Sequence, residues 1–114
     1  MDIQTNTISN SVVVKLDGRF DASVANNFKT AIGDLIDGGQ INFVIDLADV
    51  NYMDSTGLGS LVACLRRVGK EEGEIKLSSP TPKVRKVFEL TRTHRIFDIY
   101  DDSSVAAQSF ANPA

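Results

Sequence analysis

The sequence has almost none of the residues that build covalent or metal-bound frameworks. Cys64 is the single cysteine and His94 the single histidine among 114 residues. One cysteine cannot form an intramolecular disulfide, and neither residue has a second of its kind to complete a thiolate or imidazole metal site. We therefore expect a fold held together by its hydrophobic core, without metal or cofactor, in the cytoplasm.

Long apolar runs and an excess of positive charge are missing as well. No apolar stretch approaches the roughly 20 residues that a transmembrane helix requires. The first ten residues, MDIQTNTISN, lack the basic and then apolar pattern of a secretory signal. The net charge of −3 argues against binding to nucleic-acid phosphates, which usually needs a basic face. We expect neither membrane insertion nor a nucleic-acid partner.

The chain does have enough apolar residues for one globular core. Hydrophobic residues make up 42% of the sequence, and its length suits one domain rather than two. We predict a single domain over residues 1–110 and a frayed tail over 111–114. No long apolar edge strand or exposed heptad repeat is evident, so a monomer is expected.

Strand-like and helix-like patterns alternate along the chain, which predicts an α/β fold. Apolar residues at three- and four-residue steps mark the helices, and short runs of β-branched and aromatic residues mark the strands. The predicted strands cover residues 3–8, 12–16, 41–47, 74–77 and 96–100, and the predicted helices cover 23–37, 55–72, 82–90 and 101–110. This order favours a mixed, mostly parallel sheet of four to five strands, flanked by three to four helices.

The most informative stretch is Phe43–Gly59, FVIDLADVNYMDSTGLG. It predicts a buried strand, a short loop and an Asp-Ser-Thr-Gly turn that opens a helix. Ser55 and Thr56 then lie at a helix N-terminus beside Asp54, where free backbone N–H groups and the helix dipole favour an anion. Ser55 is either an ordinary helix cap, worth about 1 kcal/mol, or a phosphate acceptor.

Three segments in the same order resemble a known family. They are LDGRFDAS (residues 16–23), FVIDLADVNYMDSTGLGSLV (43–62) and VRKVFELTRTHRIFDIYDD (84–102). Together they resemble the STAS domain, and specifically a stand-alone bacterial anti-sigma factor antagonist. The chain departs from the family at Arg92-Thr93-His94, where a glycine and an apolar residue are more usual.

The resemblance implies a phosphorylation switch at Ser55. In this family the unmodified protein binds an anti-sigma factor, which is an ATP-using serine kinase, and thereby frees a sigma factor. The kinase phosphorylates the hydroxyl that corresponds to Ser55, which ends binding, and a serine phosphatase resets the protein. The implied partner- and kinase-binding residues are Asp21, Asp54, Thr56, Gly57, Leu58 and Gly59. Thr56 remains a second possible acceptor.

Catalysis by the chain itself is not expected. It has no Gly-rich loop of the P-loop pattern, and a serine hydrolase motif would need glycine where Met53 stands. The alternative to the switch is a STAS docking subunit of a lipid transporter or another signalling complex, which works without phosphorylation.

Three further features allow two interpretations. Asp21 is most simply a helix N-cap, with partner contact implied only by the resemblance. Tyr52 and Met53 belong either to the core or to a partner surface. The basic residues near the third helix form either a solvated face or a docking surface for an acidic partner; they are Lys83, Arg85, Lys86, Arg92 and Arg95.

Overall fold

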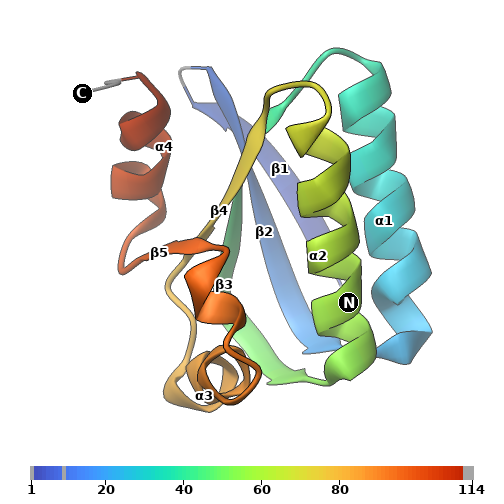
Figure 1. The fold of residues 1–114 in the computed structure, drawn as a ribbon, viewed down its shortest axis with the longest axis vertical. Helices are drawn as coiled ribbons and strands as arrows, with labels where there is room; N and C mark the ends of the chain where they lie inside the picture. The colour runs from blue at the N-terminus through green and yellow to red at the C-terminus, as the bar shows by residue number, and fades with distance from the viewer. Residues whose placement is uncertain (1, 9, 112–114) are drawn as a thin grey trace.

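The computed structural model describes residues 2–8 and 10–111 as one five-stranded sheet with helices on both faces (Figure 1). The strands are β1 (Asp2–Ile8), β2 (Ser11–Phe20), β3 (Asn42–Met53), β4 (Glu74–Ser78) and β5 (Asp98–Tyr100). The helices are α1 (Ala22–Asp37), α2 (Ser55–Gly69), α3 (Pro82–Leu90), the short 3₁₀ helix η1 (Thr93–Arg95) and α4 (Ser103–Ala111). The predicted element order is confirmed.

Each strand of the sheet pairs with its neighbour in the chain, in the order β1-β2-β3-β4-β5. β1 and β2 are antiparallel, and the other three pairings are parallel. The carboxyl ends of β2 to β5 therefore meet at one edge of the sheet, where such folds place their functional loops. The predicted mixed, mostly parallel sheet is confirmed.

Helices α1, α2 and α3 cover one face of the sheet and form the main core. Phe28 from α1, Leu61 from α2 and Phe88 from α3 are fully buried in the same cluster as Phe43 and Ile45 of β3. Burying an apolar side chain of this size contributes about 1.5–3 kcal/mol, so this layer supplies most of the stability.

Helix α4 covers the opposite face, on the left in Figure 1. Its Ala106 and Ala107 pack against Val13 and Val44, and their small size lets the helix lie close to the sheet. Lys76 of β4 is buried beneath α4, where its Nζ donates to the Ser109 hydroxyl and lies 4.2 Å from the centre of the Phe110 ring. The ammonium group thus ties the end of α4 to the sheet.

The prediction of a short loop between the third strand and Asp54 was wrong. β3 continues through Met53, because β2 also continues, to Phe20, and supplies pairing partners along the extra length. At two register shifts β3 carries one more residue than β2, and one of these shifts lies beside Gly18 with its φ of +114°. Val50 and Met53 extend the buried side of β3 and stabilise the extension.

Other boundaries moved by a few residues. α2 ends at Gly69 rather than near Gly73, since Glu72 adopts a φ of +63°. Residues 93–95 form η1 instead of leading straight into β5. Thr81 caps α3 by accepting a hydrogen bond from the Val84 amide at 3.3 Å. Ala111 belongs to α4 rather than to a tail, and residues 112–114, the rest of the predicted tail, lie outside the described residues.

Among residues 2–8 and 10–111, no helix is long and apolar enough to cross a membrane. In the same part of the chain, no three His, Cys, Asp or Glu side chains gather in a way that could hold a metal ion.

Candidate functional site

Two helices begin side by side at the carboxyl edge of the sheet. Phe20 ends β2 and Met53 ends β3, and the two residues are register partners. Asp21 and Asp54 follow directly, and each is the N-cap of the next helix. The Asp54 amide donates to the Phe20 carbonyl at 3.3 Å, which joins the two strand ends. The pairing of β2 with β3 thus places the starts of α1 and α2 next to each other.

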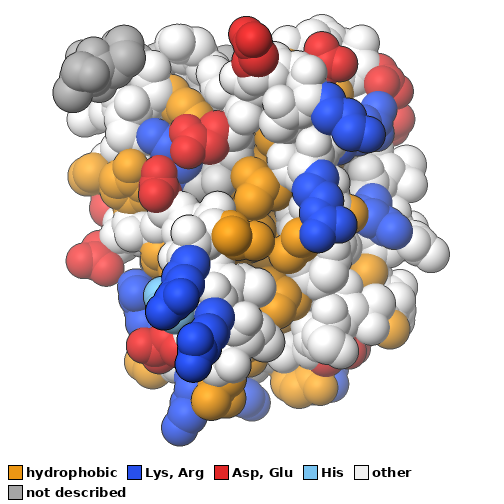
Figure 2. All heavy atoms as spheres, in the orientation of Figure 1, with side chains coloured by type: hydrophobic (Ala, Val, Ile, Leu, Met, Phe, Trp, Pro, Cys, Tyr) orange, Lys and Arg blue, Asp and Glu red, His pale blue; other side chains and the backbone are white. Residues whose placement is uncertain are grey.

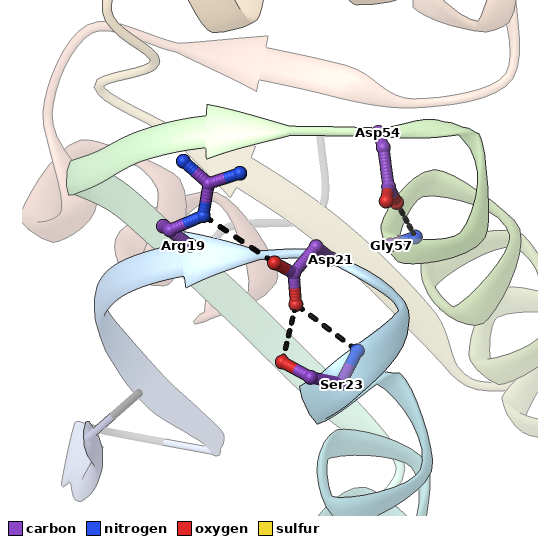
Figure 3. A network of polar contacts seen from close by, with 5 residues as sticks. All are labelled: Arg19, Asp21, Ser23, Asp54 and Gly57. Atoms are coloured by element: carbon purple, nitrogen blue, oxygen red, sulfur yellow. Dashed lines mark hydrogen bonds and ion pairs between the residues drawn. The ribbon is translucent and has the colours of Figure 1, made fainter.

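Asp54, rather than Ser55, caps α2. The Asp54 Oδ1 accepts a hydrogen bond from the Gly57 amide at 2.9 Å, which satisfies one free donor of the first turn (Figure 3). Ser55 is the first residue of the helix and is exposed. Within residues 2–8 and 10–111, its hydroxyl makes no hydrogen bond with another group. The interpretation of Ser55 as the cap is wrong, because the neighbouring carboxylate takes that place.

The predicted partner-binding residues around Ser55 fall into two groups. Thr56 and Gly59 are exposed on the first turns of α2, and Asp54 is half-buried beside them. Gly57 and Leu58 are buried, and Leu58, 6% exposed, packs into the main core. These two residues therefore face the interior and expose little surface that a partner could contact.

Gly57 marks the closest approach of α2 to β2. A Cβ added at Gly57 would lie 2.1 Å from the Phe20 carbonyl oxygen, a distance that no real Cβ tolerates. At Gly59 an added Cβ meets nothing within 4 Å. Gly57 is therefore required for the packing of α2 against β2, whereas a side chain at Gly59 would only add to the surface.

Asp21 caps α1 through a small network of polar contacts (Figure 3). Its Oδ1 accepts from the Ser23 amide at 3.0 Å and from the Ser23 hydroxyl at 2.6 Å, and its Oδ2 lies 3.4 Å from Nε of Arg19. The hydrogen bond from the Ser23 hydroxyl is the main reason why the pKa of Asp21 lies below its usual 3.8; partial burial opposes it, and Arg19 adds to it. Asp21 is therefore ionised at neutral pH, and the predicted N-cap is confirmed.

An aromatic ring between two cations lies at the same edge, and no local pattern in the sequence predicts this arrangement. The Arg19 guanidinium lies 4.1 Å from the centre of the Tyr52 ring, and the Lys83 ammonium lies 5.7 Å from the same centre. Tyr52 is half-buried, while Met53 belongs to the core. Arg19 and Tyr52 are register partners, so only the true length of β2 and β3 would have brought them together.

Cys64 lies within α2, away from this edge. It is 4% exposed, and burial raises the pKa of its thiol to about 11. The thiol is therefore protonated at neutral pH and poorly reactive.

The comparisons with known proteins decide the family. Residues 2–106 match the STAS domain. This chain belongs to the STAS domain family. It is 32% identical over 108 residues to the anti-sigma-B factor antagonist of Bacillus subtilis, covering 95% of this chain and 96% of that protein.

Solved structures agree with this membership. A crystal structure of an anti-sigma factor antagonist from Mycobacterium paratuberculosis superposes with a TM-score of 0.87 at 26% identity, over 97% of this chain and 94% of that one. The Bacillus cell fate determinant SpoIIAA in its phosphorylated form has the same fold, with a TM-score of 0.73 at 21% identity, over 94% of this chain and 98% of that one.

Proposed function

We propose that this chain is an anti-sigma factor antagonist controlled by phosphorylation of Ser55. In the unphosphorylated state it binds an anti-sigma factor serine kinase and frees a sigma factor. The kinase transfers the γ-phosphoryl group of ATP to the Ser55 hydroxyl, and the antagonist leaves. A serine phosphatase removes the phosphate in the cytoplasm. The chain is the substrate and ligand in this cycle and performs no catalysis of its own.

The exposure of the Ser55 hydroxyl carries the proposal. Ser55 is the first residue of α2, and its neighbour Asp54 performs the capping that would otherwise engage the hydroxyl. The acceptor oxygen is thus free to enter a kinase active site without loss of the cap. Relatives named as anti-sigma factor antagonists, and a phosphorylated protein of the same fold, support this assignment.

The helix is expected to survive phosphorylation. A phosphate adds about −1.5 to −2 charges. At a helix N-terminus a negative charge is favourable by roughly 0.3–1 kcal/mol, because free backbone N–H groups point toward it. The nearby carboxylate of Asp54 opposes this gain. The two effects offset each other in part, so the fold remains and the surface changes.

The partner is expected to respond to the new charge rather than to a new shape. A partner surface that fits a neutral hydroxyl would have to desolvate a dianion, at a cost of several kcal/mol unless it supplies a cation. This cost exceeds the roughly 1.4 kcal/mol that changes an equilibrium constant tenfold. Phosphorylation of one residue can therefore release the partner completely.

The test is phosphosite mapping by mass spectrometry on the protein isolated from its own cells, during growth and under stress. We expect phosphate on Ser55 in a fraction that changes with the growth condition. The Ser55→Ala variant should lose it, while the matched Thr56→Ala variant should keep it.

Absence of phosphate from both hydroxyls under every condition would overturn the switch. The chain would then be a docking module that works without phosphorylation, as in a lipid transporter complex. Phosphate that persists in Ser55→Ala and disappears in Thr56→Ala would move the acceptor by one residue and keep the cycle.

A further inference from the structure

Basic side chains gather on α3 and the turn that follows it. Residues 82–96 hold five of the chain's 12 lysines and arginines and a single carboxylate, Glu89, although the whole chain carries a net charge of −3. Figure 2 shows these blue side chains around the pale-blue histidine, with hydrophobic side chains close by. The charge of this surface is therefore opposite in sign to that of the protein as a whole.

Three exposed residues of α3 lie on one side of the helix. Lys83, Lys86 and Leu90 are separated by three and four positions, so they share a face of α3. The opposite face, with Val84 and Phe88, is buried in the core. We call the surface formed by Lys83, Lys86, Leu90, Arg92, Arg95 and Ile96 the basic face.

The cations of the basic face lack carboxylate partners. Within residues 2–8 and 10–111, no ion pair within 4.0 Å involves Lys83, Lys86, Arg92 or Arg95. Arg85, which lies outside the basic face, has the fully exposed Asp101 at 3.7 Å. Two aliphatic side chains stand among the cations, with Leu90 76% and Ile96 51% exposed. The surface thus combines uncompensated positive charge with apolar area that no other element covers.

The turn that carries Arg92 is firmly held. The Thr91 hydroxyl donates to the Val87 carbonyl at 2.7 Å, and Nδ1 of His94 lies 3.3 Å from the Phe88 carbonyl oxygen. These contacts satisfy carbonyls at the end of α3 and fix η1 beside it. Arg92 itself has a φ of +60°, a conformation that glycine adopts with less strain. The turn therefore presents a cation at a position whose backbone conformation favours glycine.

We propose that the basic face binds an acidic segment of a partner protein, in which carboxylates flank apolar side chains that cover Leu90 and Ile96. Charge complementarity favours this occupant over a bilayer, because the apolar stripe of α3 is already buried and only two aliphatic side chains remain to enter lipid. It also favours protein over nucleic acid, since Tyr52, the aromatic ring beside Lys83, is half-buried and already contacts Arg19, and the rest of the chain repels phosphate.

The probe is a synthetic peptide in which Asp and Glu surround leucines, and the control peptide replaces the acids by Asn and Gln. Binding is followed by ¹H–¹⁵N amide shifts of the whole chain. We expect the acidic peptide to shift amides of residues 83–96, with an affinity that falls as salt is added. The Lys86→Glu/Arg92→Glu variant should bind about tenfold more weakly or worse.

A charge-matched variant isolates the position from the net charge. Lys29→Glu/Lys70→Glu alters two exposed lysines on α1 and just after α2, so it has the same net charge as the test variant. We expect it to bind the acidic peptide like the unmodified chain. Arg92→Gly removes one cation at a backbone conformation that suits glycine, so weaker binding by this folded variant would support the proposal.

Several results would overturn the proposal. The first is that both double variants lose binding equally, and the second is that the acidic peptide shifts no amides. The third is that the basic face binds phosphatidylserine vesicles or duplex DNA instead of the peptide. This peptide test does not depend on the proposed switch at Ser55. The Ser55→Ala variant should bind the acidic peptide as the unmodified chain does, even if Ser55 is never phosphorylated in cells.

Discussion

Gly57 lies against the backbone carbonyl of Phe20 so closely that any side chain at Gly57 would collide with it. The oxygen would be 2.1 Å from an added Cβ, and the carbonyl carbon 2.9 Å away. The same carbonyl accepts the Asp54 amide. One backbone group of β2 therefore fixes both the start of α2 and the distance of its first turn from the sheet.

Gly57→Ala is expected to destabilise the protein. The backbone carbonyl cannot rotate away as a flexible side chain would, so α2 must shift, at a cost of about 1–3 kcal/mol. Gly59→Ala is the matched control in the same turn. It meets open space and should raise the free energy of unfolding by about 0.5–1 kcal/mol, because alanine is the better helix former. Urea unfolding of both variants tests the pair, and equal effects would contradict this account.

Asp54→Ala should lower the free energy of unfolding by about 0.5–2 kcal/mol. The variant leaves the Gly57 amide without its hydrogen bond at the start of α2. Asp54→Asn keeps an oxygen at the same place and should retain most of the stability. Ser55→Ala should change it by less than about 0.5 kcal/mol, since that side chain is exposed. A larger loss in Ser55→Ala than in Asp54→Ala would show that the cap is misassigned.

The contribution of Asp21 to stability should depend on pH in the acid range. Its pKa in the folded protein is below 3.8, so the carboxylate stabilises the fold above pH 3.8 and loses this effect as the pH falls through the lower, folded value. Asp21→Asn should therefore be less stable than the unmodified protein at pH 6, and the difference should shrink toward pH 2.5. A ¹³C titration of the Asp21 carboxyl gives the pKa directly. A midpoint above 3.8 would contradict the network with Ser23.

Cys64 should resist alkylation while the protein is folded. Its thiol is buried and has a pKa of about 11, so the reactive thiolate is scarce at pH 7.5. Iodoacetamide should modify it only after unfolding in urea. A variant that exchanges the positions, Ala63→Cys with Cys64→Ala, puts the thiol at an exposed place in the same helix and should react readily in the native state. Rapid native labelling of Cys64 would mean that α2 opens often.

Arg92→Gly should leave the fold intact and raise the free energy of unfolding by about 0.5–1 kcal/mol, because glycine relieves the strain of a positive φ. Arg95→Gly is the control in the following 3₁₀ helix, where φ is ordinary, and should lower stability. Thermal melts of the two variants compare the effects. A destabilised Arg92→Gly would mean that the arginine side chain stabilises the turn.

Periodicity predicted the fold because each segment carries a clear pattern. The stripe of α1 and the alternation in Ile41–Leu47 follow from local physics, and they set the order of strands and helices correctly. The ends of β2 and β3 were harder to predict. Asp49 looks like a loop residue, yet its pairing with Asp17 of β2 holds it in a strand, and such pairing depends on residues far away in the sequence.

The start of α2 was predicted in position but not in detail. Asp54 and Ser55 are both good N-cap residues, so local preference alone cannot choose between them. The position at which β3 ends decides between the two caps, because it sets which residue is the last one before the helix. Gly57 and Gly59 look alike in the sequence, and only the approach of β2 separates their roles. The contact of Tyr52 with Arg19 and Lys83 brings together residues of β2, β3 and α3, so no single segment predicts it.

The sequential order of the sheet also bears on how the protein forms. Each strand after β1 pairs with the strand just before it, so each step closes a loop that holds one turn, one helix or, between β4 and β5, α3 and η1. Short closures cost less chain entropy than long ones, so the sheet can form strand by strand from the N-terminus during synthesis. The adjoining starts of α1 and α2 need only the chain as far as α2. The Ser55 surface can therefore take shape while the last strand and α4 are still being translated.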